Sequence, residues 1–166
     1  MGNRVSARIT IGGRVPADQV DNLCEAIEDE ALGPSWDEGF DSREALLAHL
    51  RAGKDGADLY ANEVNGGEFD ILQAFCAAQG LVYQLTYDGY PGEWGPATRL
   101  RHADGTEESC ALDSDGDAVI GRFELTVQGF ASVDEIHAYL ERFERFRPGR
   151  LILGDEHGAG DGGGAP

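Results

Sequence analysis

Residues 16–42 constrain the fold most strongly, because they contain nine carboxylates and no lysine or arginine. Apolar side chains recur there at the intervals of one helical face, at Val20, Leu23, Cys24, Ile27 and Ala31. This pattern predicts an amphipathic helix that buries the apolar stripe and exposes the carboxylates. Neighbouring like charges destabilise an isolated helix by about 0.2–0.5 kcal/mol per pair. Helix propensity therefore does not explain the acidic face, and attraction to a basic partner is one explanation of it.

The acidity is not confined to this stretch, because the whole chain has a net charge of −18. A surface so negative repels nucleic acids and anionic membranes, and it attracts the basic grooves of nucleic-acid-binding proteins. The alternative is that the acidity serves only solubility. Under the first interpretation we predict a partner-binding surface in which carboxylates take the place of phosphates. Its residues are Asp21, Glu25, Glu28, Asp29, Asp37 and Glu38.

A second acidic region covers residues 101–121, which contain six carboxylates and one arginine. If the fold places the two regions side by side, they form one continuous anionic surface of the kind that a DNA or RNA backbone presents.

The order of strand and helix patterns predicts the fold class. Residues 4–11 alternate strictly between apolar and polar side chains, which indicates a strand with one buried face. Main helices are expected to begin near Pro16, Gly67 and Ser132. Further extended segments are separated by Asp-Gly and other turn signals: 57–64, 81–87, 98–102, 108–112, 118–123 and 151–153.

We therefore predict one α+β domain over residues 1–153, in which three main helices pack on one face of a mainly antiparallel sheet of about five to six strands. Residues 154–166 are rich in glycine and acidic side chains, and we expect them to form a flexible tail. The chain has no apolar signal core and no run approaching the ~18 residues of a membrane span, so we expect a cytoplasmic protein.

The three cysteines are predicted to be buried thiols. Cys24 and Cys76 fall on the apolar faces of expected helices, and Cys110 falls in an expected strand. Free buried cysteine behaves as a small apolar residue. No C-x-x-C pair occurs, so the sequence supports neither a zinc site nor a redox motif.

Residues 113–124 resemble a twelve-residue calcium loop in the spacing of their oxygen ligands. Ala118 stands where the sharp turn of such a loop requires glycine, and the flanking segments are expected to be strands. A hairpin turn at Asp115-Gly116 explains the same residues without a metal ion. The calcium site remains an alternative prediction, with the ligands Asp113, Asp115, Asp117 and Glu124.

The loop from residue 88 to residue 96 displays two aromatic side chains, Tyr90 and Trp94, among glycines and prolines. Tyrosine and tryptophan are frequent hot spots of protein interfaces, and under this interpretation both residues bind the partner. Under the other interpretation the two rings fold back and close one end of the core.

Catalytic and cofactor-binding motifs are absent from the sequence, and the four histidines share no ligand spacing, so we expect neither an enzyme nor a bound cofactor. In size and charge the chain is similar, as a functional type, to the anti-restriction and anti-CRISPR inhibitors of phages and other mobile elements. We therefore predict an acidic binding protein that inhibits a basic nucleic-acid-binding protein or complex. A calcium module, a general acidic interaction or immunity protein, and a homodimer covering the sheet face with Arg4 and Arg8 are the open alternatives.

Overall fold

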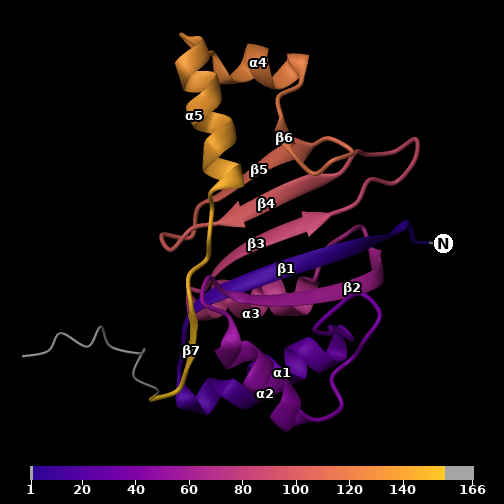
Figure 1. Ribbon diagram of the computed structural model, residues 1–166, viewed down its shortest axis with the longest axis vertical. Helices are drawn as coiled ribbons and strands as arrows, with labels where there is room; N and C mark the ends of the chain where they lie inside the picture. Colours follow the sequence, from indigo (N-terminus) through magenta and orange to yellow (C-terminus); the bar gives the residue numbers. More distant parts are fainter. Residues whose placement is uncertain (1, 156–166) are drawn as a thin grey trace, which may run out of the picture.

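The computed structural model describes residues 2–155, which form a seven-stranded sheet and five α-helices (Figure 1). In chain order the elements are β1 (Arg4–Val15), the 3₁₀ helix η1 (Ala17–Gln19), α1 (Val20–Asp29), α2 (Arg43–Ala52), β2 (Ala57–Asn65), α3 (Asp70–Gln79), β3 (Val82–Tyr87), β4 (Ala97–Arg101), β5 (Glu107–Leu112), β6 (Ala118–Val119), α4 (Arg122–Gln128), α5 (Val133–Glu144) and β7 (Leu151–Leu153). The predicted α+β class and antiparallel sheet are confirmed. The predicted tail lies, from residue 156 onward, outside the described residues.

The long strand β1 lies next to the edge strand β2 in the sheet, whose strand order is β2-β1-β3-β4-β5-β6. It pairs antiparallel with β2 on one side and β3 on the other. Its last residues pair instead with β7, in parallel, from Gly13 to Val15. All other neighbouring strands are antiparallel, and the Asp-Gly turns predict this for β4-β5 and for β5-β6.

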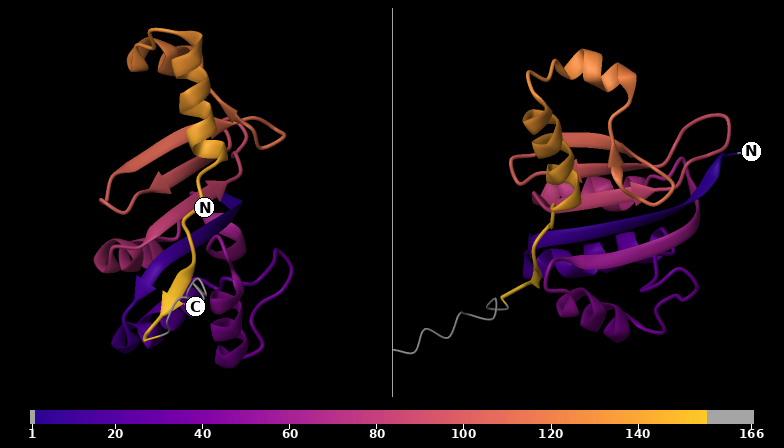
Figure 2. Two further views of the ribbon diagram at one scale, coloured as in Figure 1. Left: turned by 60° about the vertical axis from the view of Figure 1, so that its left-hand side comes forward. Right: turned by 45° about the horizontal axis from the view of Figure 1, so that its top comes forward.

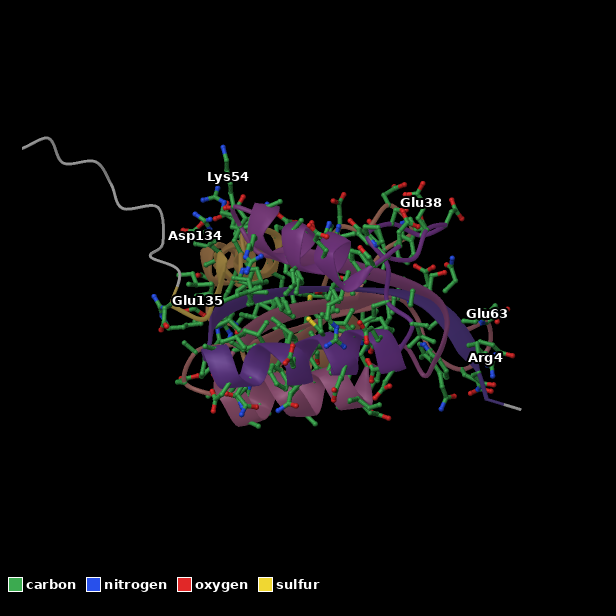
Figure 3. All side chains as sticks on the ribbon, turned by 90° about the horizontal axis from the view of Figure 1, so that it is seen from below. Arg4, Glu38, Lys54, Glu63, Asp134 and Glu135 are labelled. Atoms are coloured by element: carbon green, nitrogen blue, oxygen red, sulfur yellow. The ribbon has the colours of Figure 1, made fainter. Side chains whose placement is uncertain are left out.

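The larger core lies on one face of β1, where Ala7, Ile9 and Ile11 are completely buried. These residues pack in one cluster with the apolar stripe of α1, including Leu23 and Ile27. α1 and α3 cover this face, while α2 lies on the other side of the sheet beside β2 (Figures 1 and 3). The apolar residues of the alternating stretch 4–11 thus lie on the face of the sheet that α1 and α3 cover.

A smaller core forms on the opposite face, toward the other edge of the sheet. Thr10, Gln84 and Leu100 are register partners in successive strands, so they share one face. Leu100 is completely buried there against Phe143 of α5. α5 therefore packs on the face opposite to α1 and α3, whereas the sequence predicted three main helices on one face. Helical periodicity identifies which side of a helix is apolar, but not which face of the sheet that side meets.

The region after β5 also differs from the prediction. The expected strand 118–123 ends after two residues, and helix α4 begins at Arg122. None of the residues of α4 is buried. Because no face of this segment packs on a core, its apolar residues show no helical periodicity that would distinguish it from a strand. All three cysteines are buried and free, as predicted. None of the helices between residues 2 and 155 is long and apolar enough to cross a membrane.

The segment that joins α5 to β7 crosses the end of the sheet directly above Gly12. A Cβ atom added to Gly12 would lie 2.2 Å from the carbonyl oxygen of Gly149 and 2.6 Å from that of Pro148. The crossing is held by two backbone hydrogen bonds, from Gly149 N to Asp55 O and from Gly13 N to Arg150 O. Glycine at residue 12 is thus a steric requirement of this crossing.

We predict that Gly12→Ala destabilises the protein by about 1–3 kcal/mol, the usual cost of forcing an extra carbon into a packed site. Chemical denaturation of the variant checks this value. Gly39→Ala is the matched control, because a Cβ at Gly39 meets nothing within 4 Å. Equal stability of the two variants would contradict the close crossing.

Candidate functional site

The four predicted carboxylates of α1 are exposed on the outer helical layer, as the apolar stripe requires. Neither α1 nor α3 contains a lysine or arginine, and Asp70 adds a further exposed carboxylate at the start of α3. The layer formed by α1 and α3 is called here the acidic layer. Its negative charge is not compensated by any cation from its own two helices.

Arg43, at the start of α2, neutralises part of the acidic layer. Its Nη2 lies 2.8 Å from Glu28 Oε2 and its Nε donates to Glu28 Oε1 at 3.2 Å. The hydrogen bond from Arg43 lowers the pKa of Glu28. Asp21 lies 3.6 Å from Arg43 Nη1. Glu25 and Asp29 make no ion pair with any residue between 2 and 155, so they present the uncompensated charge.

The other predicted carboxylates lie elsewhere. Asp37 and Glu38 are exposed in the loop before α2, and Glu38 lies on the side of the sheet opposite to α1 (Figure 3). The acidic residues of 101–121 belong to the β4-β5-β6 end of the sheet, far from α1 (Figure 1). The fold therefore keeps the two acidic regions apart, and the continuous anionic surface considered from the sequence does not form.

Glu30 has a structural position that the sequence did not indicate. Its Oε1 accepts a hydrogen bond from the backbone N–H of Ile71 at 2.6 Å, which caps the start of α3 from the end of α1. Its Oε2 is buried and has no hydrogen-bond partner among residues 2–155. Burial raises the pKa of Glu30, and the hydrogen bonds from the α3 backbone oppose that rise.

The predicted aromatic loop folds upon itself. Tyr90 and Trp94 are half-buried, with ring centroids 5.4 Å apart, and Tyr90 N donates to Trp94 O at 2.9 Å. The indole Nε1 of Trp94 is buried without a hydrogen-bond partner among the described residues. The two rings thus contact each other and remain partly exposed, an arrangement between the two that the sequence allowed.

The predicted calcium loop has the geometry of a hairpin turn. Asp113 Oδ1 accepts hydrogen bonds from the backbone N–H groups of Asp115 and Asp117, at 2.9 and 3.0 Å. Glu124 lies beyond β6, in the first turn of α4. Between residues 2 and 155 no group of three or more His, Cys, Asp or Glu side chains is placed to hold a metal ion. The calcium site stays a prediction without support from this arrangement.

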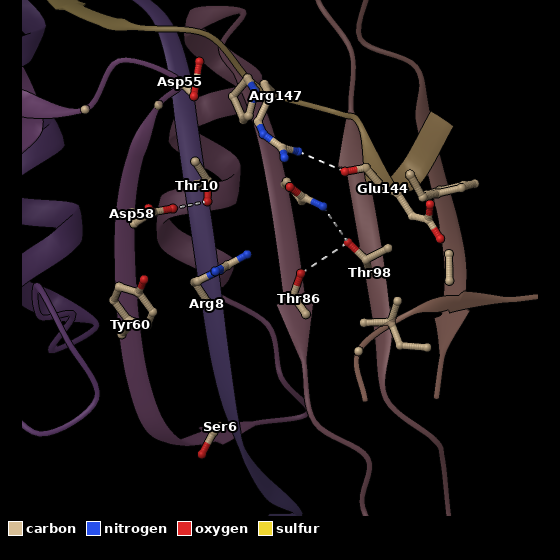
Figure 4. A pocket seen from close by; sticks show the side chains of 18 of the residues that line it. Ser6, Arg8, Thr10, Asp55, Asp58, Tyr60, Thr86, Thr98, Glu144 and Arg147 are labelled. Carbon is tan, nitrogen blue, oxygen red and sulfur yellow. Dashed lines mark hydrogen bonds between the residues drawn. The ribbon is translucent and has the colours of Figure 1, made fainter. Parts of the chain in front are cut away.

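A polar groove of about 810 Å³ lies on the face of the sheet opposite to α1 and α3 (Figure 4). Its floor consists of β2, β1, β3 and β4. One wall is formed by Trp36 and the turn before β2, and the other by the end of α5 and the segment that follows it. Ligand sites in proteins commonly enclose about 300–1,000 Å³.

The floor of the groove carries the polar half of the strand alternation. Thr10 donates to Asp58 across β1 and β2, and the hydroxyls of Thr86 and Thr98 lie 3.3 Å apart across β3 and β4. Arg8 lies between these pairs, in the middle of the floor (Figure 4). Periodicity in residues 4–11 predicts the polar face but not that the helices leave it open.

Comparison of the chain with protein-family models, with curated proteins and with solved structures gave no significant match. The geometry described above therefore carries the functional argument alone.

We predict that Glu30→Gln changes how stability depends on pH. The pKa of Glu30 is higher in the folded state than in the unfolded state, so folding favours the protonated form. The parent protein therefore loses stability as the pH rises from the usual glutamate pKa through the raised pKa. Glutamine keeps an acceptor for Ile71 and removes the buried charge. The stability of the variant relative to the parent should therefore increase between about pH 4.5 and neutral pH.

Urea denaturation across this pH range measures the effect. The matched control is Glu25→Gln, which removes an exposed carboxylate from the same helix. If both variants responded to pH in the same way, Glu30 would not be the buried acid described here.

Proposed function

We propose that this protein is a non-catalytic, cytoplasmic binding protein that occupies a basic surface of a nucleic-acid-binding partner through its acidic layer. The observation that carries the proposal is that α1 and α3 expose carboxylates and contain no cation. An inhibitor of the anti-restriction or anti-CRISPR type acts in this manner, by taking the place of phosphates on Lys and Arg side chains.

The rigidity of the layer supports this function. α1 is anchored by Leu23, Cys24 and Ile27, which are completely buried, and α3 by Leu72 and Cys76. Side chains on packed helices are presented to a partner without the entropic cost of ordering a loop. Such an arrangement suits a fixed pattern of negative charges.

The ion pairs within the protein indicate which carboxylates of the acidic layer contribute most to binding the partner. Glu28 and Asp21 share Arg43, so their attraction to a partner is partly compensated within the protein. Glu25 and Asp29 have no such compensation among residues 2–155. Electrostatic attraction to a basic groove acts over about 10 Å at 0.1 M salt, so it accelerates association and weakens as salt increases.

The aromatic loop and the loop with Asp37 and Glu38 are secondary contacts in this proposal. They lie away from the outer face of α1, and a partner reaches them only if its surface extends around an edge of the sheet. The acidic layer is sufficient to define the main epitope.

The test begins with a pull-down of the tagged protein from a nuclease-treated lysate of its natural host, washed at low and high salt. We predict recovery of a DNA- or RNA-binding protein that is lost at high salt. Replacing Glu25 and Glu28 with Gln and Asp29 with Asn should weaken its binding by about 100-fold at low salt, which corresponds to about 2.8 kcal/mol.

A matched control removes the same number of charges from the far end of the sheet, by replacing Asp113, Asp115 and Asp117 with Asn. The acidic-layer variant should fold normally and lose binding, and the control should retain it. Equal binding by the parent and the acidic-layer variant would refute the epitope. A partner indifferent to salt would show that the acidity serves solubility.

A further inference from the structure

The polar groove contains three of the chain's 13 basic side chains: Arg8, Lys54 and Arg147. Each comes from a different part of the fold: β1, the turn after α2 and the segment after α5. The same groove is lined by four carboxylates, Asp55, Asp58, Asp88 and Glu144, so cations and anions are mixed in it. Their convergence is produced only by the tertiary structure.

Arg8 is the central residue of this groove. Its guanidinium carries five N–H donors, and none of them has a hydrogen-bond or ion-pair partner between residues 2 and 155. The other arginine on the same face of β1, Arg4, is paired with Glu63 at 3.5 Å. Arg8 is half-buried, and no carboxylate among residues 2–155 pairs with it.

Arg147 approaches the same space from the opposite wall. Its Nη1 donates to the backbone oxygens of Glu144 and Phe146, at 3.0 and 2.7 Å, which orients the side chain and leaves Nε and Nη2 unbonded among the described residues. In Figure 4 the side chain of Arg8 points from β1 toward β3, and the guanidinium group of Arg147 extends over β3 from the wall. The groove therefore presents donors from its floor and from its wall.

Carboxylates in the groove do not cancel these donors. Asp58 accepts a hydrogen bond from Thr10, while Asp55, Asp88 and Glu144 make no ion pair with the three cations. Their presence lowers the attraction of the groove for anions at long range. Recognition must therefore depend on direct contact with Arg8.

An aromatic wall completes the groove on the side of β2. Trp36 and Tyr60 meet edge to face with centroids 4.9 Å apart, and Trp36 remains 43% exposed. Exposed aromatic rings beside polar donors are typical of sites that hold a small ligand by its apolar body and orient it through its polar group.

We propose that the polar groove binds a small organic anion whose phosphate or carboxylate group contacts Arg8. Arginine matches the geometry of these oxyanions through two parallel hydrogen bonds. Arg147 and the hydroxyls on β3 and β4 hold the same group, and Trp36 and Tyr60 contact the remainder of the ligand. The site is independent of the acidic layer and lies on the other face of the sheet.

Isothermal titration calorimetry at low salt tests the site with three probes: AMP, inorganic phosphate and citrate. We expect saturable binding of AMP or citrate with a dissociation constant on the order of 1 mM or below. Binding of AMP and phosphate but not citrate identifies a phosphate site, and the reverse identifies a carboxylate site. Absence of saturable binding for all three probes overturns the proposal.

The variant Arg8→Gln should weaken binding by about tenfold or more. It should leave stability to denaturant unchanged or higher, because Arg8 makes no ion pair with any residue between 2 and 155. Arg4→Gln is the matched control, since Arg4 lies on the same face of β1 but outside the groove. Equal affinity of the parent and Arg8→Gln overturns the assignment.

A separate observation concerns α4, which contains no buried residue. Among the described residues, six large apolar side chains are exposed, and four of them lie on α4 or at the start of α5: Phe123, Leu125, Val127 and Val133. Helices of seven residues are not stable alone in water. Figure 2 shows α4 projecting beyond the sheet, where no other element covers it.

The charge around this apolar patch favours a second copy of the chain as its partner. Residues 122–150 contain five acidic and five arginine side chains, so the net charge of −18 resides in the remainder of the chain. Two identical acidic molecules repel each other when they come into contact. The repulsion is smallest where the contacting segment has no net charge, as in residues 122–150. We infer that two copies associate through the patch on α4 and the start of α5.

Sedimentation equilibrium tests this interface, with a dimer expected at protein concentrations on the order of 100 μM. Phe123→Ser should convert the dimer to a monomer. Ile71→Ser removes an exposed apolar side chain from α3 and should leave the dimer intact. A monomeric parent, or dimers formed equally by both variants, would overturn the inference. Neither variant alters the polar groove or the carboxylates of the acidic layer.

Discussion

The pairing of β1 with three other strands is the interaction on which the rest of the structure depends. β1 holds β2 and β3 along most of its length and β7 at its end. Its apolar residues form the floor of the larger core, and its polar residues form the floor of the groove. A substitution that shifts its register by one residue would exchange these two faces and expose the core.

The groove exists because the two layers of helices are displaced from each other. α1 and α3 cover one face of the sheet at β1 and β2, whereas α5 covers the other face at β4 and β5. The polar face of β1 and β3 therefore lies beside α5 instead of under it. The crossing above Gly12 returns the chain from α5 to β7 and places Arg147 at the wall of the groove.

The same arrangement separates the charges of the protein. Among residues 2–155, Glu25 and Asp29 of the acidic layer make no ion pair, and neither do Arg8 and Arg147 of the polar groove on the opposite face. The two proposed binding sites therefore lie on different surfaces: the acidic layer for a basic macromolecule and the polar groove for a small anion. Because the two surfaces share β1 and its core, substitutions in that core would disturb both together.

The sequence by itself determined the elements whose signals are local. The alternation of residues 4–11, the apolar stripe of α1 and the Asp-Gly turns depend on neighbouring residues, so they identified the α+β class and the buried cysteines. Only the tertiary structure decided that α5 packs on the opposite face, that the acidic regions stay apart, and that Arg8, Lys54 and Arg147 line one groove. Those features depend on contacts between residues as much as 139 positions apart, for which the local pattern contains no signal.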